Sequence, residues 1–214
     1  MELSPDLKPY VDEAKRSPLS SKMIDLLGKP LKTSGEIFPM DMVPVIATGK
    51  SRKQMVFPMV WGFDITGLDR PVVNARIETA KDKPSFRDAW LSRRCIIPAS
   101  CYFEWEHFIK PNGKKKTGDK YAIQPKNCTV TYLTGLYQLQ EYRGLTYPVF
   151  TVLTREPSES VKAIHDRMPV VMPEDAIADW INPEKKAEDT IPLALTDMNA
   201  RKETGRYEQL RIEL

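Results

Sequence analysis

The sequence predicts an α+β domain, a curved and mostly antiparallel β-sheet or open barrel with short flanking helices. Short apolar stretches recur along most of the chain, and many alternate with a period of two, which is typical of strands. The 214 residues include 18 Pro and only 10 Gly, and because Pro breaks helix interiors a simple helical bundle is excluded. With 41% hydrophobic residues, one domain over residues 1–214 can bury a substantial core.

Helices are expected at the start of the chain, and strands after it. Ser4 and Pro5 suit an N-cap and a first helical position, and a second helix is expected over 20–27, ending at Gly28. From about residue 43 the apolar period changes to two. Strands are expected over 43–47, 55–63, 72–77, 95–97, 102–109, 121–124, 130–139 and 147–153. Short helices are expected over 85–91, 158–164 and 174–181.

Charge and cysteine content narrow the function classes. The net charge is +3, so any site for a polyanion must be a local patch. Three Cys cannot pair fully, and no apolar run suits a signal peptide or a membrane span, so we expect a cytoplasmic protein with reduced thiols. Two His without a CxxC or HExxH motif argue against a metal, and no cofactor is expected. The lysines at 114–116 are interpreted as a solvated hairpin tip rather than a nucleic-acid contact.

A run of polar residues interrupts the apolar pattern at 72–79. In a strand, Asn74, Arg76 and Glu78 would share one face, which then carries an amide, a cation and a carboxylate. The same pattern also fits the solvent side of an edge strand. The local sequence leaves both interpretations open.

The segment 102–107 places a carboxylate among aromatic residues. The period of two puts Tyr102, Glu104 and Glu106 on one face, with Phe103 and Trp105 on the other. Burial between aromatics would raise the pKa of Glu104, as a general acid or base near neutral pH requires. A surface Glu with aromatic neighbours fits equally well.

The two histidines receive different interpretations. His165 follows a short amphipathic segment and is flanked by Asp166 and Arg167, a setting that suits proton transfer or phosphate contact. A locally hydrogen-bonded His is the structural alternative. His107 would continue the Glu104 strand on the opposite face, and we interpret it as structural.

Four motifs in order resemble the SRAP family, the SOS-response-associated peptidase proteins. Trp61-Gly62-Phe63 and the region from Pro39 to Pro44 look like earlier motifs of the family, so the resemblance covers roughly residues 36–182. The motifs are Asn74-Ala75-Arg76-Ile77-Glu78-Thr79, Pro84-Ser85-Phe86-Arg87, Arg94-Cys95-Ile96-Ile97-Pro98-Ala99 running into Phe103-Glu104-Trp105, and Ile164-His165-Asp166-Arg167-Met168-Pro169.

The resemblance implies a sensor of abasic sites in single-stranded DNA that becomes covalently joined to them. In the family, removal of the initiator Met exposes a Cys whose amine condenses with the sugar aldehyde and whose thiol closes a thiazolidine. It implies that Asn74 orients the terminal amine, Glu104 shuttles protons in Met removal and imine formation, and His165 assists sugar ring opening. Arg76 and Arg167 would hold phosphates.

Single-strand recognition also needs stacking surfaces. Trp61 and Pro39 are the candidates, although a Trp in a strand is more often core. Arg76, Arg87, Arg94 and Arg167 all fall within the motifs, so a local basic groove is compatible with the small net charge. We expect a monomer that is associated with the nucleoid when bound to DNA.

The start of the sequence departs from the family. SRAP chains open Met-Cys-Gly-Arg, whereas this sequence opens Met1-Glu2-Leu3-Ser4. A thiazolidine needs thiol and α-amine on one residue, so Cys95, Cys101 and Cys128 cannot replace the missing Cys. We expect a start several residues further upstream, and no crosslinking by the polypeptide as printed. The alternative is a non-covalent single-stranded DNA-binding module that lost the nucleophile. A third hypothesis is a cysteine hydrolase using Cys101 with His165 and Glu104.

Overall fold

The computed structural model describes residues 5–109, 113 and 115–203, and it confirms the α+β class. Five strands pair in a closed ring, so the expected open barrel is in fact closed. Around the ring β1 pairs with β2, β2 with β8, β8 with β7, β7 with β4, and β4 with β1. All these pairs are antiparallel except β2 with β8. The barrel strands are β1 (Met42–Thr48), β2 (Gln54–Trp61), β4 (Arg94–Ala99), β7 (Thr131–Tyr142) and β8 (Leu145–Arg155).

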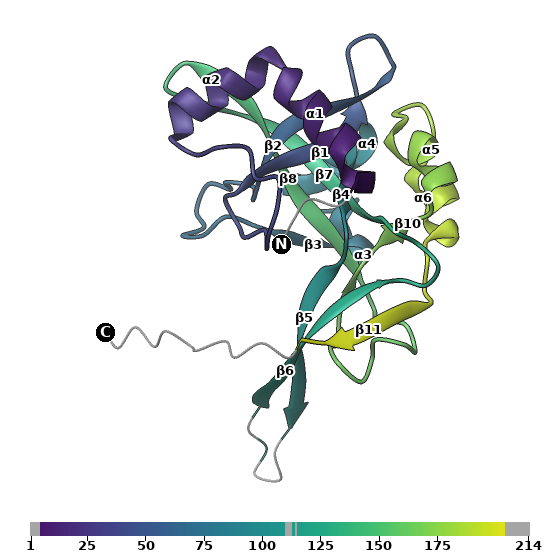
Figure 1. Cartoon of the computed structure of the whole chain (residues 1–214). Coiled ribbons are helices and arrows are strands. Elements are labelled where there is room, and N and C mark those ends of the chain that lie inside the picture. The colour runs from purple at the N-terminus through teal and green to yellow at the C-terminus, as the bar shows by residue number, and fades with distance from the viewer. Residues whose placement is uncertain (1–4, 110–112, 114, 204–214) are drawn as a thin grey trace.

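Further strands extend the barrel and form a second sheet. Three short strands join its rim, namely β3 (Asn74–Arg76) and β9 (Met168–Pro169), which both pair with β8, and β10 (Val171–Met172), which pairs with β7. A three-stranded sheet consists of β5 (Tyr102–Ile109), β6 (Lys115–Pro125) and β11 (Met198–Lys202). Figure 1 shows the β5–β6 hairpin projecting away from the barrel, with β11 beside its base.

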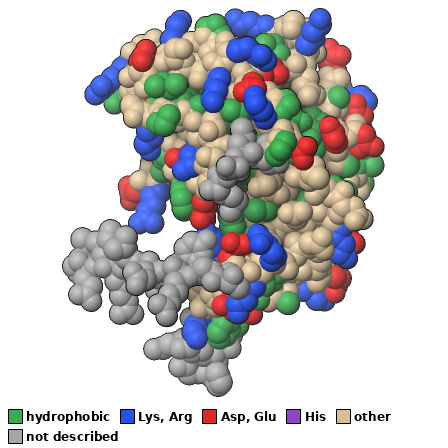
Figure 2. All heavy atoms as spheres, viewed as in Figure 1, with side chains coloured by type: hydrophobic (Ala, Val, Ile, Leu, Met, Phe, Trp, Pro, Cys, Tyr) green, Lys and Arg blue, Asp and Glu red, His purple; other side chains and the backbone are tan. Residues whose placement is uncertain are grey.

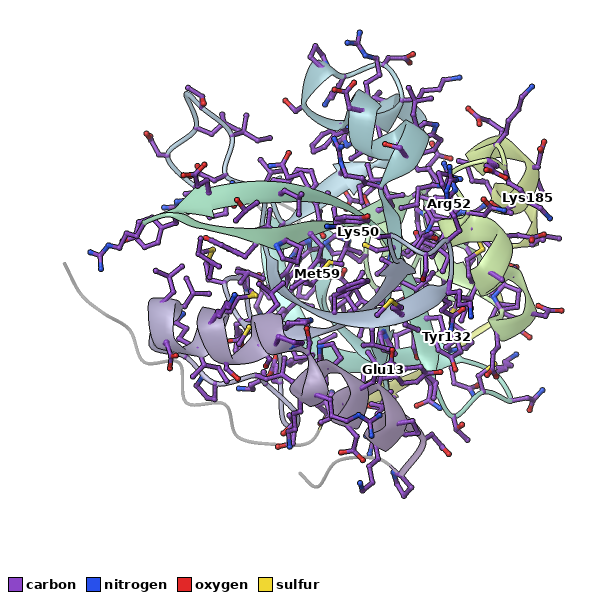
Figure 3. The ribbon with its side chains drawn as sticks, turned by 90° about the horizontal axis from the view of Figure 1, so that it is seen from above. Glu13, Lys50, Arg52, Met59, Tyr132 and Lys185 are labelled. Atoms are coloured by element: carbon purple, nitrogen blue, oxygen red, sulfur yellow. The ribbon has the colours of Figure 1, made fainter. Side chains whose placement is uncertain are left out.

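Two layers of apolar side chains explain why β1 is buried along almost all of its length. One layer fills the barrel interior and includes Val45, Ile97 and Met59. Figure 3 shows Met59 among the strands when the molecule is seen from above. The other layer packs the outer face of the barrel against the helices, with Ile46 and Ile96 among its members. A strand buried on both faces reads as a continuous apolar run rather than as an alternating one.

The helices mostly lie close to the expected ranges. The expected stop at Gly28 is confirmed, because this residue adopts φ 65° and its N–H closes the last turn. The second helix begins at Pro18, two residues before the expected start, and Ser17 caps it by accepting from the Leu19 N–H. Ser4, the expected cap of the first helix, lies outside the described residues. The helical segments are η1 (Pro5–Leu7), α1 (Lys8–Arg16), α2 (Pro18–Leu27), α3 (Ile77–Ala80), α4 (Pro84–Ser92), η2 (Glu174–Ala176), α5 (Ile177–Ile181), α6 (Ala187–Thr190) and η3 (Ile191–Leu193).

One expected element is shorter than predicted, and another is wrong. The strand over 72–77 shrinks to β3, because the chain turns into α3 at Ile77. The helix over 158–164 is a series of turns, in which Val161 and Ile164 are buried against the barrel interior layer. The three-residue spacing of these two apolar side chains is typical of a helix, but here both side chains are buried from a series of turns. No helix among the described residues is long and apolar enough to cross a membrane.

Candidate functional site

A pocket of about 560 Å³ opens at the barrel rim and brings together four of the predicted site residues. Asn74 from β3, Glu104 from β5, Trp61 from β2 and Pro39 from the loop before β1 all line it. Its apolar lining comes from barrel residues Ile97, Leu133, Phe150 and Val152. The pocket therefore has polar groups on an otherwise apolar wall, which is the usual composition of a small-ligand site.

Glu104 is the carboxylate of this pocket, and its side chain is 26% exposed. Burial raises the pKa of Glu104, the nearby His165 acts in the opposite direction, and Asp166 adds to the rise. The direction is the one predicted from the sequence. A carboxyl group whose pKa is raised toward neutrality can both accept and return a proton.

His165 lies next to Glu104 but reaches it from the turns that follow residue 158. Its Nε2 lies 3.8 Å from Glu104 Oε2, whereas its Nδ1 lies 3.1 Å from the Arg167 backbone nitrogen, 3.2 Å from the Arg167 carbonyl oxygen and 3.3 Å from Asp166 Oδ1. Either ring nitrogen can carry the proton of a neutral imidazole in this setting, and Nε2 is the one that faces Glu104. The geometry therefore suits proton exchange between His165 and Glu104, directly or through one water.

His107, interpreted as structural from the sequence, contacts His165. Its ring centroid lies 4.6 Å from that of His165, and its backbone N–H donates to the Ile164 carbonyl at 2.9 Å. Beside this contact the β5–β6 pairing is irregular, because Glu106 faces two residues of β6. No periodic pattern in the sequence marks the contact between the two histidines.

Asn74, Arg76 and Glu78 lie on the segment predicted to present them together, but not as one strand face. Asn74 and Arg76 are exposed on β3 with Ala75 buried between them, which confirms the alternation there. Glu78 belongs to α3, and its carboxylate accepts from both Nη atoms of Arg167 at 2.9 and 2.8 Å. Arg167, expected to hold a phosphate, is thus paired with a carboxylate in this structure.

Trp61 and the loop at Pro39 form one wall of the pocket. The Trp61 ring stacks on Phe150 with an interplanar angle of 5°, and its Nε1–H donates to the Val73 carbonyl at 2.9 Å. The Met40 N–H donates to the Trp61 carbonyl, which fastens the exposed loop at Pro39 to this strand. Trp61 is half-buried, so it is both a packed residue and a pocket wall.

Cys101 lines the pocket as well, but its chemistry is unsuited to a nucleophile. Burial raises the pKa of the Cys101 thiol, whereas a reactive cysteine needs a lowered one. Among the described residues no contact joins Cys101 to His165, and no three His, Cys, Asp or Glu side chains are grouped to hold a metal ion. The geometry therefore argues against the cysteine hydrolase hypothesis.

One of the four arginines expected in a basic groove is buried. Arg94 is 3% exposed and donates to the backbone carbonyls of Trp90, Leu91, Trp180, Asn182 and Lys185. It joins β4 to the α5–α6 region and cannot contact DNA. Figure 2 shows Lys and Arg side chains interspersed with Asp and Glu over the visible face. Of the lysine run, Lys114 lies outside the described residues, and the Lys116 ammonium lies 5.3 Å from the Phe108 ring.

Comparison with protein families gives a match to the SOS response associated peptidase (SRAP) family over residues 13–208. The chain belongs to the SRAP family. The match is longer than the segment over which the sequence motifs suggested a resemblance, since it also includes the end of α1, all of α2 and β11.

Known SRAP relatives and solved structures agree with this assignment. The Abasic site processing protein YoaM of Bacillus subtilis is 35% identical over 155 residues, which are 71% of this chain and 64% of YoaM. The Abasic site processing protein YedK of Escherichia coli is 28% identical over 141 residues, 64% of this chain and 60% of YedK. The matched region thus spans less than two thirds of these relatives. A crystal structure of a Bacteroides thetaiotaomicron protein shares the fold, with TM-score 0.68, 21% identity, and coverage of 94% of this chain and 89% of that one.

Proposed function

We propose that this SRAP protein processes abasic sites in single-stranded DNA, and that Asn74, Glu104 and His165 carry the chemistry. The observation that carries the proposal is the position of Glu104. Its pKa is raised, its Oε2 lies 3.8 Å from Nε2 of His165, and it lines the same pocket as Asn74. The names of the relatives supply the substrate class. An abasic sugar is small enough to enter a pocket of about 560 Å³.

The first step in this proposal opens the sugar ring. The hemiacetal hydroxyl loses its proton while the ring oxygen gains one, which gives a free aldehyde and a 4′-hydroxyl. His165 exchanges this proton through Nε2, which faces Glu104. The apolar lining excludes bulk water and strengthens the interaction of these groups with the sugar.

The covalent step in this proposal uses an N-terminal cysteine, as the SRAP resemblance implies. The amine nitrogen adds to the aldehyde carbon, water leaves, and an imine forms. The thiol sulfur then adds to the imine carbon while the nitrogen takes up the proton, which closes a thiazolidine. Asn74 orients the amine, and Glu104 moves the protons here and during removal of the initiator Met. The pocket is also lined by Leu7, Tyr10 and Val11, so the beginning of the described chain lies beside it, which supports entry of an upstream segment.

DNA binding in this proposal relies on a stacking wall and on phosphate contacts. Trp61 and Pro39 offer surfaces for unpaired bases at the pocket. Arg76 is exposed next to Asn74 and is the better placed of the two predicted phosphate ligands. Arg167 can contribute only together with Glu78, because their guanidinium and carboxylate groups are paired.

The decisive experiment compares the printed chain with the same chain preceded by Met-Cys-Gly-Arg. Both are incubated with a single-stranded oligonucleotide containing one abasic site, and with an intact oligonucleotide as control, and are then analysed by denaturing electrophoresis. We expect a heat-resistant shifted band only for the extended chain with the abasic oligonucleotide. Salt-dependent binding without such a band in either protein would instead support the non-covalent module.

A further inference from the structure

One wall of the pocket is a loop between α2 and β1 whose two ends lie together. Leu31 and Met42 form a parallel bridge, and the Lys32 N–H donates to the Met42 carbonyl at 2.7 Å. Residues 32–41, which we call the pocket loop, therefore form a closed loop of the kind that often carries function. Residues 32–39 all line the pocket, so the conformation of this loop sets the shape of the pocket.

The two halves of the pocket loop are held differently. The second half is tied to β2 through its backbone, because the Met40 N–H donates to the Trp61 carbonyl at 2.9 Å and the Trp61 N–H donates to the Asp41 carbonyl at 3.0 Å. Within the described part of the chain, the backbone groups of residues 33–37 form no hydrogen bond. The first half therefore depends on its side chains for a fixed position.

The Glu36 side chain connects this first half to the second sheet. Both of its carboxylate oxygens lie 2.6 Å from Nζ of Lys120 in β6. The Lys120 side chain is only 5% exposed, and its ammonium lies 4.3 Å from the centre of the Phe103 ring. Gly35 turns the chain directly before Glu36, with a φ of 75° that favours glycine. The ion pair thus joins the pocket loop to the strand pair that carries Glu104.

The burial of Lys120 gives this ion pair its directing effect. A charge taken out of water is costly unless an opposite charge meets it, so the buried ammonium holds the Glu36 carboxylate at one position. Ile37 also packs against the barrel interior layer, but an apolar contact has no preferred direction. The ion pair is therefore the contact that fixes residues 33–37 beside the pocket.

We propose that Lys120 is a positioning residue for the pocket, which through Glu36 holds residues 33–37 as a fixed wall and so raises the affinity for abasic DNA. Lys120 is too buried to contact DNA itself. A wall that is already ordered spares the DNA complex the entropy of ordering it, which is the physical reason for the gain. The effect on DNA rests on the proposed function, whereas the ordering of the loop does not.

Nitrogen NMR relaxation of the backbone amides of residues 33–37 measures the order of the loop. We expect order parameters of about 0.85 in the wild type and below about 0.6 in Lys120→Met, in which Met can still pack on Phe103. Lys202→Met breaks an exposed ion pair with Asp119 in the same sheet, and this matched control should leave the loop as ordered as in the wild type. Unchanged order parameters in Lys120→Met would overturn the proposal.

A double-mutant cycle assigns the effect to the pair. Glu36→Ala, Lys120→Met and the double variant should lose the same amount of order, because each removes the same contact. A double variant whose loop is clearly less ordered than that of Lys120→Met would show that the two side chains act independently, against the proposal. If Glu36→Ala fails to fold because Lys120 is left buried and unpaired, Lys120→Met and the double variant, which lack that charge, complete the comparison.

Fluorescence anisotropy with an abasic single-stranded oligonucleotide, at several salt concentrations, tests the consequence for DNA. Affinity should fall about tenfold in Lys120→Met at every salt concentration, because the loop must then be ordered on binding. The slope of the logarithm of the affinity against the logarithm of the salt concentration should stay unchanged, since no phosphate contact is lost.

The alternative outcomes separate the proposal from the proposed function. A slope reduced by about 0.7 would show that Lys120 holds a phosphate, which would overturn its role as a positioning residue. An unchanged affinity together with a disordered loop would overturn the effect on DNA. Absence of binding by all of the proteins, with loop order lost in Lys120→Met, would reject the proposed function and leave the role of Lys120 in ordering the loop standing.

Discussion

Arg167 joins two walls of the site through Glu78. Its guanidinium donates to both oxygens of the Glu78 carboxylate at 2.9 and 2.8 Å, and also to the Thr154 carbonyl at 2.7 Å. Its backbone N–H, in turn, donates to His165. The pair thus links α3, which follows Asn74 and Arg76, to the turn that presents His165 to Glu104. Bidentate pairs of this kind fix orientation better than single contacts.

Glu78→Gln should therefore disturb His165 more than it disturbs the fold. The amide accepts only one of the two Arg167 hydrogen bonds, and the pair is partly exposed, so we expect a loss of about 1 kcal/mol in the free energy of unfolding. Activity on an abasic oligonucleotide should fall by about tenfold or more, since small misplacements in a site are costly. Thermal unfolding and a crosslinking time course measure the two effects. Equal, small effects of Glu78→Gln and of Glu156→Gln, a nearby exposed control, would contradict this role.

Glu104→Gln should stabilise the protein at neutral pH while abolishing its chemistry. Because the folded protein holds the Glu104 proton more tightly than the unfolded chain does, ionised Glu104 lowers the free energy of unfolding above the ordinary pKa of a carboxyl group. The variant should gain on the order of 1 kcal/mol at pH 7. The gain should vanish as pH falls below about 4, where Glu is protonated in both states.

Denaturant unfolding at several pH values measures this difference, with Glu106→Gln as the control on the same strand. A stability gain that persists unchanged at low pH would show that packing, rather than ionisation, is its cause.

Substitution of Arg94 and of Arg76 should show that the first arginine is structural and the second binds DNA. Arg94→Met leaves buried carbonyls without donors, so we expect a loss of about 3 kcal/mol in the free energy of unfolding. Arg76→Met removes an exposed charge and should change stability by less than about 0.5 kcal/mol. Arg76→Met should, however, reduce the slope of the logarithm of the affinity for single-stranded DNA against the logarithm of the salt concentration by about 0.7. A reduced slope for Arg94→Met with unchanged stability would be incompatible with its buried position.

Trp61→Leu tests the stacking wall. Leu fills part of the space on Phe150 but offers no flat ring to a base, so affinity for single-stranded DNA should fall by about tenfold. Trp61→Phe should retain most of the affinity, since it keeps a ring. Trp105→Leu, on the projecting hairpin, is the matched control and should bind like the wild type. Fluorescence anisotropy with a labelled oligonucleotide measures all three, and equal losses in Trp61→Leu and Trp105→Leu would refute a specific role for Trp61.

The fold class and most of the strands followed from local patterns, because the strands are short and apolar. Barrel closure could not be predicted, since the parallel pairing of β8 with β2 joins segments far apart in the sequence. Asn74 and Glu104 were predicted as site residues from the resemblance to the family, and Trp61 and Pro39 as stacking surfaces. That all four line one pocket is known only from the structure. The contact of His107 with His165 could not be predicted, because it joins β5 to a turn far away in the sequence that no local pattern marks. The spacing of the buried Val161 and Ile164 fits a helix as well as the observed turns, so the local sequence could not distinguish the two.

The parallel pairing of Asn74 with Val152 also sets the order in which the site can form during synthesis. Strand β3 has only three residues and pairs with β8, so Asn74 has no fixed place until the chain has been made past residue 155. His165 and Arg167 follow only ten or so residues later in translation. A nascent chain therefore lacks the complete pocket for most of its synthesis, although Trp61 and Glu104 have already been made. Assembly of the pocket is one of the last events in the folding of the described residues.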